Sequence, residues 1–251
     1  MGSSCPCRQS YGSNFCTERK LATFLLVHGA CHGAWAWEKV MPLLAANGHR
    51  VSAPDLRDAP ARAGLDVMSA RAEHVAALIE RQKEKVILVG HSLGGAIISR
   101  VAEMAPERIA RLVYLAALLS PSGSDIASMP VTEDAPPLVF QADGTTFIFD
   151  PATAHETLFH DCPMPDAFAA MKRLHPEPVE VLRAQMPLLS DRYESVARAY
   201  IVTALDRAIA PEHQLAMIAA MPCAQVETVE SGHSPFYSMA EGLTDMLVSL
   251  A

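Results

Sequence analysis

Basic residues are scarce in this sequence, with 20 Lys and Arg against 28 Asp and Glu, for a formal net charge of -8 at pH 7. Nucleic acids and anionic membranes select clusters of basic residues, so this balance argues against both as partners. No apolar run approaches the roughly 18 residues of a membrane span. The first 20 residues lack the apolar stretch of a secretory signal, and Pro6 stands where a myristoylation signal needs Ser or Thr. We therefore expect a cytoplasmic protein.

Cysteine is sparse as well, with three residues in the polar N-terminal stretch and three scattered singly. The six are Cys5, Cys7, Cys16, Cys31, Cys162 and Cys223. A chain of this length needs no disulfides, and without a secretion signal its thiols are expected to be reduced. The Cys5–Pro6–Cys7 stretch has no matching second ligand pair, which favours an ordinary tail over a zinc site. We interpret residues 1–20 as a flexible N-terminal extension outside the fold and expect no bound metal.

Half of the residues are hydrophobic and 19% are charged, which is typical of a soluble globular protein. Short apolar runs alternate with helical periodicity from Leu21 onwards. The segments that predict strands are 21–29, 50–56, 85–90, 110–118, 197–205 and 224–231, of which 21–29 reads as a strand buried on both faces. The segments that predict helices are 36–50, in which Asn47–Gly48 ends the helix, 67–84, 93–105, 211–220 and 234–251. This alternation predicts an α/β fold with a parallel sheet and crossover helices on both faces.

The alternation stops after about Leu119 and resumes near Arg198. This interval holds ten of the eighteen prolines and five of the eight phenylalanines. Proline at that density excludes long regular elements, so a separate domain here would be small and poor in core. We expect a cap inserted at about 119–195 over one end of the sheet, within a single domain of 21–251. Some phenylalanines should face a pocket and others should pack the cap itself; they are Phe140, Phe147, Phe149, Phe159 and Phe168.

The segment GHSLGG, from Gly90 to Gly95, joins a predicted strand to a predicted helix. Its glycines allow a tight turn that would hold the Ser92 hydroxyl out of the sheet, at the carboxyl edge where parallel sheets bind ligands. The N–H of Leu93, at the start of the helix, would point to the same place. This context favours a nucleophile elbow over a glycine-rich packing turn, with Ser92 as nucleophile and Leu93 as oxyanion donor.

A serine hydroxyl needs a base to take its proton, and His233 is the best placed of the ten histidines. It lies in a loop after the last predicted strand, which puts it at the same sheet edge as Ser92. His28 and His91 also adjoin strand ends, and we interpret them as buried structural residues. The histidines of the cap, expected to be solvated or to bind ligand, are His155, His160 and His175.

The base in turn needs a carboxylate that fixes its tautomer. Asp206 follows a predicted strand end after the cap. The resulting chain order of Ser92, Asp206 and His233 is the one expected for this sheet topology. Asp191 is the competing candidate, but it precedes the strand and would lie at the wrong end.

The second oxyanion donor is predicted in the loop after the first strand, within VHGACHGAW. Gly29 lets the backbone approach a ligand closely, which would leave the N–H of Ala30 free to point into the site. A plain strand-to-helix turn would need the glycine but not the repeated His–Gly pair.

Together these residues resemble the α/β-hydrolase superfamily. The segments LLVHGACHGAWAW, LVGHSLGGA and GHSPFYSMAEGL look most like the branch that contains plant methyl esterases and hydroxynitrile lyases. The resemblance implies a six-stranded parallel core, a cap, and no metal or organic cofactor. The residues that it implies as catalytic triad and oxyanion hole are Ser92, Asp206, His233, Ala30 and Leu93.

Two positions separate the lyases from the esterases of that branch. The lyases carry Thr where this sequence has Gly29 and Lys where it has Ser234, and the lysine stabilises departing cyanide by its charge. The sequence therefore predicts a carboxylesterase that acts on small to medium apolar esters through an acyl-enzyme. Lyase-like cleavage of a carbon–carbon bond and a non-catalytic receptor for a small ligand remain alternatives. A homodimer is also left open.

Overall fold

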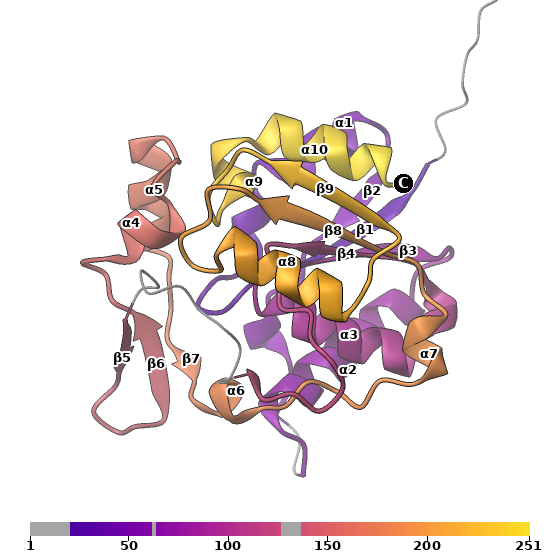
Figure 1. Ribbon diagram of the computed structural model, residues 1–251, viewed down its shortest axis with the longest axis horizontal. Coiled ribbons are helices and arrows are strands. Elements are labelled where there is room, and N and C mark those ends of the chain that lie inside the picture. Colours follow the sequence, from indigo (N-terminus) through magenta and orange to yellow (C-terminus); the bar gives the residue numbers. More distant parts are fainter. Residues whose placement is uncertain (1–20, 62–63, 127–136) are drawn as a thin grey trace, which may run out of the picture.

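The computed structural model describes residues 21–61, 64–126 and 137–251. Its main sheet has six strands: β1 (Thr23–Val27), β2 (Arg50–Ser52), β3 (Val86–His91), β4 (Ile109–Leu115), β8 (Arg198–Thr203) and β9 (Gln225–Val229). They lie in the order β2-β1-β3-β4-β8-β9 and every neighbouring pair is parallel (Figure 1). The predicted α/β fold is thereby confirmed. The predicted extension at residues 1–20 lies outside the described residues.

Helices cover both faces of this sheet (Figure 1). On one face lie α1 (Val40–Ala46), α9 (Pro235–Ser238) and α10 (Ala240–Ser249), and on the other α2 (Val67–Glu80), α3 (Gly94–Met104) and α8 (Pro211–Ala220). Alternate strand residues serve the two cores: Leu88 packs with α2 and α3, whereas Ile87 and Val89 pack with α1 and α10. Burial on both faces explains why the four inner strands, β1, β3, β4 and β8, read as nearly continuous apolar runs, whereas the edge strands β2 and β9 are partly exposed and carry polar residues.

The chain leaves the main sheet after β4 and returns at β8, and we call residues 116–197 the insertion. Its described elements are β5 (Leu138–Phe140), β6 (Thr146–Phe149), α4 (Ala154–Leu158), α5 (Met164–Met171), β7 (Glu177–Pro178), α6 (Glu180–Arg183) and α7 (Asp191–Glu194). The strands form a small antiparallel sheet in the order β5-β6-β7. These elements are all short, as the proline content predicts. Most of them lie beyond the carboxyl edge of the main sheet (Figure 1).

The five phenylalanines of the insertion divide by burial. Phe147 and Phe159 are completely enclosed, the first in the core beside α2 and α3 and the second in the core on the opposite face. Phe140 and Phe168 are about half exposed, and Phe149 is partly buried against both cores. The interpretation that several of them only pack is therefore confirmed for Phe147 and Phe159.

Two predicted helices are each split in two. The segment 36–50 forms a 3₁₀ turn, η1 (Ala34–Trp37), followed by α1. An uninterrupted helix would place Pro42 in its interior, whereas a start at Val40 places this proline in the first turn, where no N–H is needed.

The segment 234–251 breaks at Met239, whose φ of -145° is not helical. The single closing helix predicted there is wrong, because the chain turns so that Leu243 packs on the sheet.

Candidate active site

Ser92 occupies the turn between β3 and α3, as predicted. Its φ of +51° lies in the left-handed region, which non-glycine residues adopt mainly where the surrounding structure forces them to. The turn is crowded: a Cβ on Gly90 would lie 2.7 Å from the carbonyl oxygen of Gly94, and one on Gly94 would lie 2.8 Å from that of Val27. Glycine is therefore required on both sides of the serine, and the side chain of Ser92 remains partly exposed.

Asp206 and His233 follow β8 and β9 at the same edge of the sheet, and they form a hydrogen-bonded pair. Nδ1 of His233 lies 2.8 Å from Oδ2 of Asp206. With its proton on Nδ1, the neutral imidazole presents Nε2 as a free acceptor. The other carboxylate oxygen accepts hydrogen bonds from the N–H groups of Ala208 and Ile209.

The pKa of Asp206 results from opposing effects. Burial would raise it, but the charge and hydrogen bond of His233, together with hydrogen bonds from neighbouring groups, outweigh burial and lower the pKa below its ordinary value. Asp206 is thus ionised at neutral pH and can orient His233.

His91 joins this pair to the Ser92 turn. Its Nε2 donates to the backbone carbonyl of His233 at 2.8 Å, and the two ring centroids lie 4.6 Å apart. Since His91 immediately precedes Ser92, this contact brings the loops carrying Ser92 and His233 together. Asp191, the competing acid, is exposed on α7, before the amino end of β8.

The loop after β1 packs directly on Ser92. A Cβ on Gly29 would lie only 2.8 Å from Cβ of Ser92. Nδ1 of His28 hydrogen bonds to the carbonyl of Gly29 at 2.8 Å. Because a trans peptide places its C=O and N–H on opposite sides, the N–H of Ala30 points away from His28. The other predicted donor, the N–H of Leu93, lies at the N-cap of α3.

The interpretation of His28 and His91 as buried structural residues is confirmed. Nε2 of His28 accepts from the N–H of Leu56 at 3.0 Å, and burial lowers the pKa of His28 to about 4. Burial likewise lowers the pKa of His91 well below its ordinary value. Sequence reasoning missed a third member, His32, which stacks on Trp35 and whose pKa falls to about 3 through burial.

These neutral histidines predict a loss of stability in mild acid. The unfolded chain protonates them below about pH 6.5 while the folded protein does not, so the unfolded state binds more protons between about pH 6.5 and 4. Stability therefore falls as the pH drops through that range. His28 and His32 should each lower the free energy of unfolding by about 2 kcal/mol at pH 5 relative to pH 7, and His91 acts in the same direction. Urea titrations at the two pH values measure this, and equal midpoints would contradict it.

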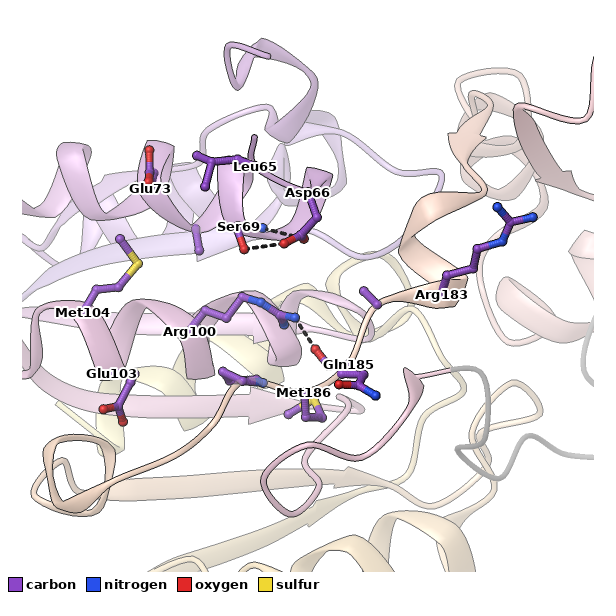
Figure 2. A pocket seen from close by; sticks show the side chains of 13 residues that line it. Leu65, Asp66, Ser69, Glu73, Arg100, Glu103, Met104, Arg183, Gln185 and Met186 are labelled. Atoms are coloured by element: carbon purple, nitrogen blue, oxygen red, sulfur yellow. Dashed lines mark hydrogen bonds between the residues drawn. The ribbon is translucent and has the colours of Figure 1, made fainter. Parts of the chain in front are cut away.

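A cavity of about 640 Å³ lies elsewhere, between α2, α3 and residues 183–187 of the insertion. Figure 2 shows its lining of mixed charge, in which Arg100 hydrogen bonds to the backbone carbonyl of Gln185. None of the predicted site residues lines it. Over the described ranges, no three His, Cys, Asp or Glu side chains converge as a metal site requires, and no helix is long and apolar enough to cross a membrane.

The parallel sheet with helices on both faces, and the serine, histidine and aspartate gathered at its carboxyl edge, define an α/β hydrolase. The alpha/beta hydrolase family model matches residues 24–246, and the chain belongs to that family. Methylesterase 1 of Arabidopsis thaliana is 33% identical, over 93% of this chain and 97% of its own length. Methylesterase 7 of the same plant is 32% identical, over 91% and 95%.

Solved structures show the same fold. A variant of tomato methylketone synthase I complexed with beta-ketoheptanoate superimposes with a TM-score of 0.78 at 28% identity, covering 92% of this chain and 98% of that one. A pyrethroid hydrolase from Sphingobium faniae JZ-2 gives a TM-score of 0.79 at 26% identity, covering 92% and 97%.

Proposed function

We propose that this chain is a carboxylic-ester hydrolase with Ser92 as its nucleophile. The observation that carries the proposal is the Asp206–His233 pair, which His91 ties to the strained turn of Ser92. The similarity to plant methylesterases supports esters of small alcohols as substrates. An apolar acyl or alcohol group is proposed from the phenylalanines of the insertion, of which Phe140 and Phe168 are about half exposed.

In the first half of the proposed reaction, Nε2 of His233 takes the proton of Ser92, and Oγ attacks the ester carbonyl carbon. The N–H groups of Ala30 and Leu93 stabilise the resulting oxyanion. When the tetrahedral intermediate collapses, the bond to the alcohol oxygen breaks and His233 returns the proton to that oxygen. In the second half, His233 deprotonates a water molecule, which attacks the acyl carbon; the bond from that carbon to Oγ then breaks, His233 returns the proton to Oγ, and the carboxylic acid leaves.

Burst kinetics test this proposal. Mixing the protein with excess p-nitrophenyl acetate should release p-nitrophenol in a burst stoichiometric with protein when deacylation is the slower step, followed by steady turnover. A non-catalytic receptor would bind without turnover. A panel of p-nitrophenyl esters of increasing acyl length then measures the preference for apolar acyl groups.

The unmodified protein should hydrolyse esters and show negligible cleavage of cyanohydrins. Departing cyanide needs a nearby positive charge, and Ser234, buried beside His233, supplies none. Cyanide release from mandelonitrile, corrected for spontaneous decomposition, is measured beside hydrolysis of p-nitrophenyl acetate. Fast cyanide release without ester turnover would favour the lyase alternative. Engineering lyase activity through Gly29→Thr is hindered here, because the new side chain collides with Ser92.

A further inference from the structure

Glu177, in β7 of the insertion, holds the loop after β1 in place. One carboxylate oxygen of Glu177 accepts from the N–H of Cys31 at 3.0 Å, and the other pairs with Arg71 of α2. The carbonyl of Cys31 accepts from the N–H of His175 at 3.0 Å. The side chains of Glu177 and Arg71 are 1% and 5% exposed. Cys31 has a φ of +59°, an unfavourable conformation that these contacts on both sides of the residue maintain.

This anchor acts one peptide away from the proposed oxyanion donor. The peptide between Ala30 and Cys31 is fixed at both ends, because His32 hydrogen bonds to its carbonyl at 2.7 Å and Glu177 accepts from its N–H. The preceding peptide carries the N–H of Ala30. A carboxylate that fixes Cys31 therefore also restricts the direction of that N–H.

The loop that carries His233 is held in the same way by Asp161, which lies between α4 and α5. Its Oδ2 accepts from the N–H of Gly232 at 2.6 Å and from Oγ of Ser231 at 3.0 Å. The contact is close: a Cβ on Gly232 would lie 2.7 Å from Oδ1 of Asp161. Gly232 immediately precedes His233, so this hydrogen bond fixes the backbone from which the imidazole projects.

We propose that Glu177 and Asp161 are positioning residues, through which the insertion sets the geometry of both catalytic loops. Glu177 orients the oxyanion loop and Asp161 orients the loop of the base, while neither touches the reacting atoms. This inference rests on the proposed esterase function. The insertion accordingly positions the catalytic loops, in addition to any role in covering a substrate.

An ion pair elsewhere offers a matched comparison. Asp166 of α5 also joins the insertion to the rest of the domain, through Lys39 at 2.5 Å, but it contacts neither loop. If carboxylates of the insertion served only to fasten it, loss of Asp166 and loss of Asp161 would have similar consequences. If they position the loops, only Asp161 and Glu177 should affect the chemical step.

The first experiment compares two double variants that share Arg71→Met, so that no unpaired buried charge remains. Glu177→Gln keeps an oxygen that can accept from the N–H of Cys31, whereas Glu177→Leu removes it at similar volume. We expect kcat for p-nitrophenyl acetate to fall about 10²-fold in the Leu variant, with KM little changed, and to recover in the Gln variant. The affinity for a trifluoromethyl ketone, whose serine adduct carries an oxyanion, should fall by the same factor as kcat.

The second experiment compares Asp161→Asn, Asp161→Leu and Asp166→Asn. We expect kcat to fall at least about 10-fold for Asp161→Leu, to be largely retained for Asp161→Asn, and to stay at the wild-type value for Asp166→Asn. Thermal unfolding of each variant shows whether a loss of activity reflects a loss of folded protein.

Amide hydrogen exchange measures the local stability of the two loops independently of turnover. Exchange at residues 29–33 should accelerate in the Glu177→Leu double variant, and exchange at 231–233 should accelerate in Asp161→Leu. Unchanged exchange overturns the positioning role. Equal kcat for the Gln and Leu variants of Glu177, and for Asp161→Asn and Asp161→Leu, overturns it as well. A wild-type protein that hydrolyses no ester overturns the proposed function instead, and the exchange rates still decide whether the two carboxylates hold the loops.

Discussion

Ser92→Ala should lower kcat/KM for ester hydrolysis by about 10⁴-fold or more while leaving the fold intact. The substitution removes only the partly exposed hydroxyl on which the proposed covalent step depends. Steady-state hydrolysis of p-nitrophenyl acetate, with circular dichroism as the check on folding, measures the effect.

Ser234→Ala is the matched control. Ser234 is a buried serine next to His233, and its Oγ has no hydrogen-bond partner among the residues that the structure describes. Its loss should leave activity within about two-fold of wild type, because the substitution removes no hydrogen bond and none of the proposed steps uses this hydroxyl. Comparable activity in the Ser92→Ala and Ser234→Ala variants would remove Ser92 from the nucleophile role.

Asp206→Asn should reduce kcat by about 10⁴-fold. An amide NH₂ facing Nδ1 favours the tautomer that carries its proton on Nε2, and that nitrogen can then no longer accept the proton of Ser92. Because the pKa of Asp206 is lowered, the wild-type carboxylate is ionised at neutral pH, whereas the amide of the variant is always neutral.

Asp191→Asn serves as the comparison for this acid, since Asp191 is exposed on α7 and precedes β8. It should leave kcat unchanged. A larger loss in Asp191→Asn than in Asp206→Asn would show that the acid has been assigned to the wrong residue.

Local sequence patterns predict most of the sheet and the loops of the candidate site. The run from Val86 to Val89 is apolar because both faces of β3 are buried, and the glycines around Ser92 are dictated by backbone contacts within a few residues. Asp206 and His233 could be found because parallel strands bring their carboxyl ends to one edge. Each of these patterns lies within a few neighbouring residues and can therefore be recognised from the sequence.

The parts that sequence reasoning missed depend on contacts between distant segments. Nothing around Glu177 or Asp161 distinguishes these carboxylates from solvated ones, because their partners lie 146 residues away at Cys31 and 71 away at Gly232. The break at Met239 has no Gly or Pro to mark it. The break precedes α10, whose Leu243 and Leu247 pack in the core beside the sheet, and that packing involves residues far away in the sequence.

The strand order has a consequence for biosynthesis. Ser92 and the loop after β1 are translated in the first half of the chain, whereas Asp206 and His233 follow β8 and β9, the last two strands to be made. In the proposed mechanism, Ser92 has no base until β9 has paired with β8 at the edge of the sheet. A ribosome-bound chain halted before residue 225 would therefore contain Ser92 but have no hydrolytic activity. The enzyme is thus inactive during most of its own translation.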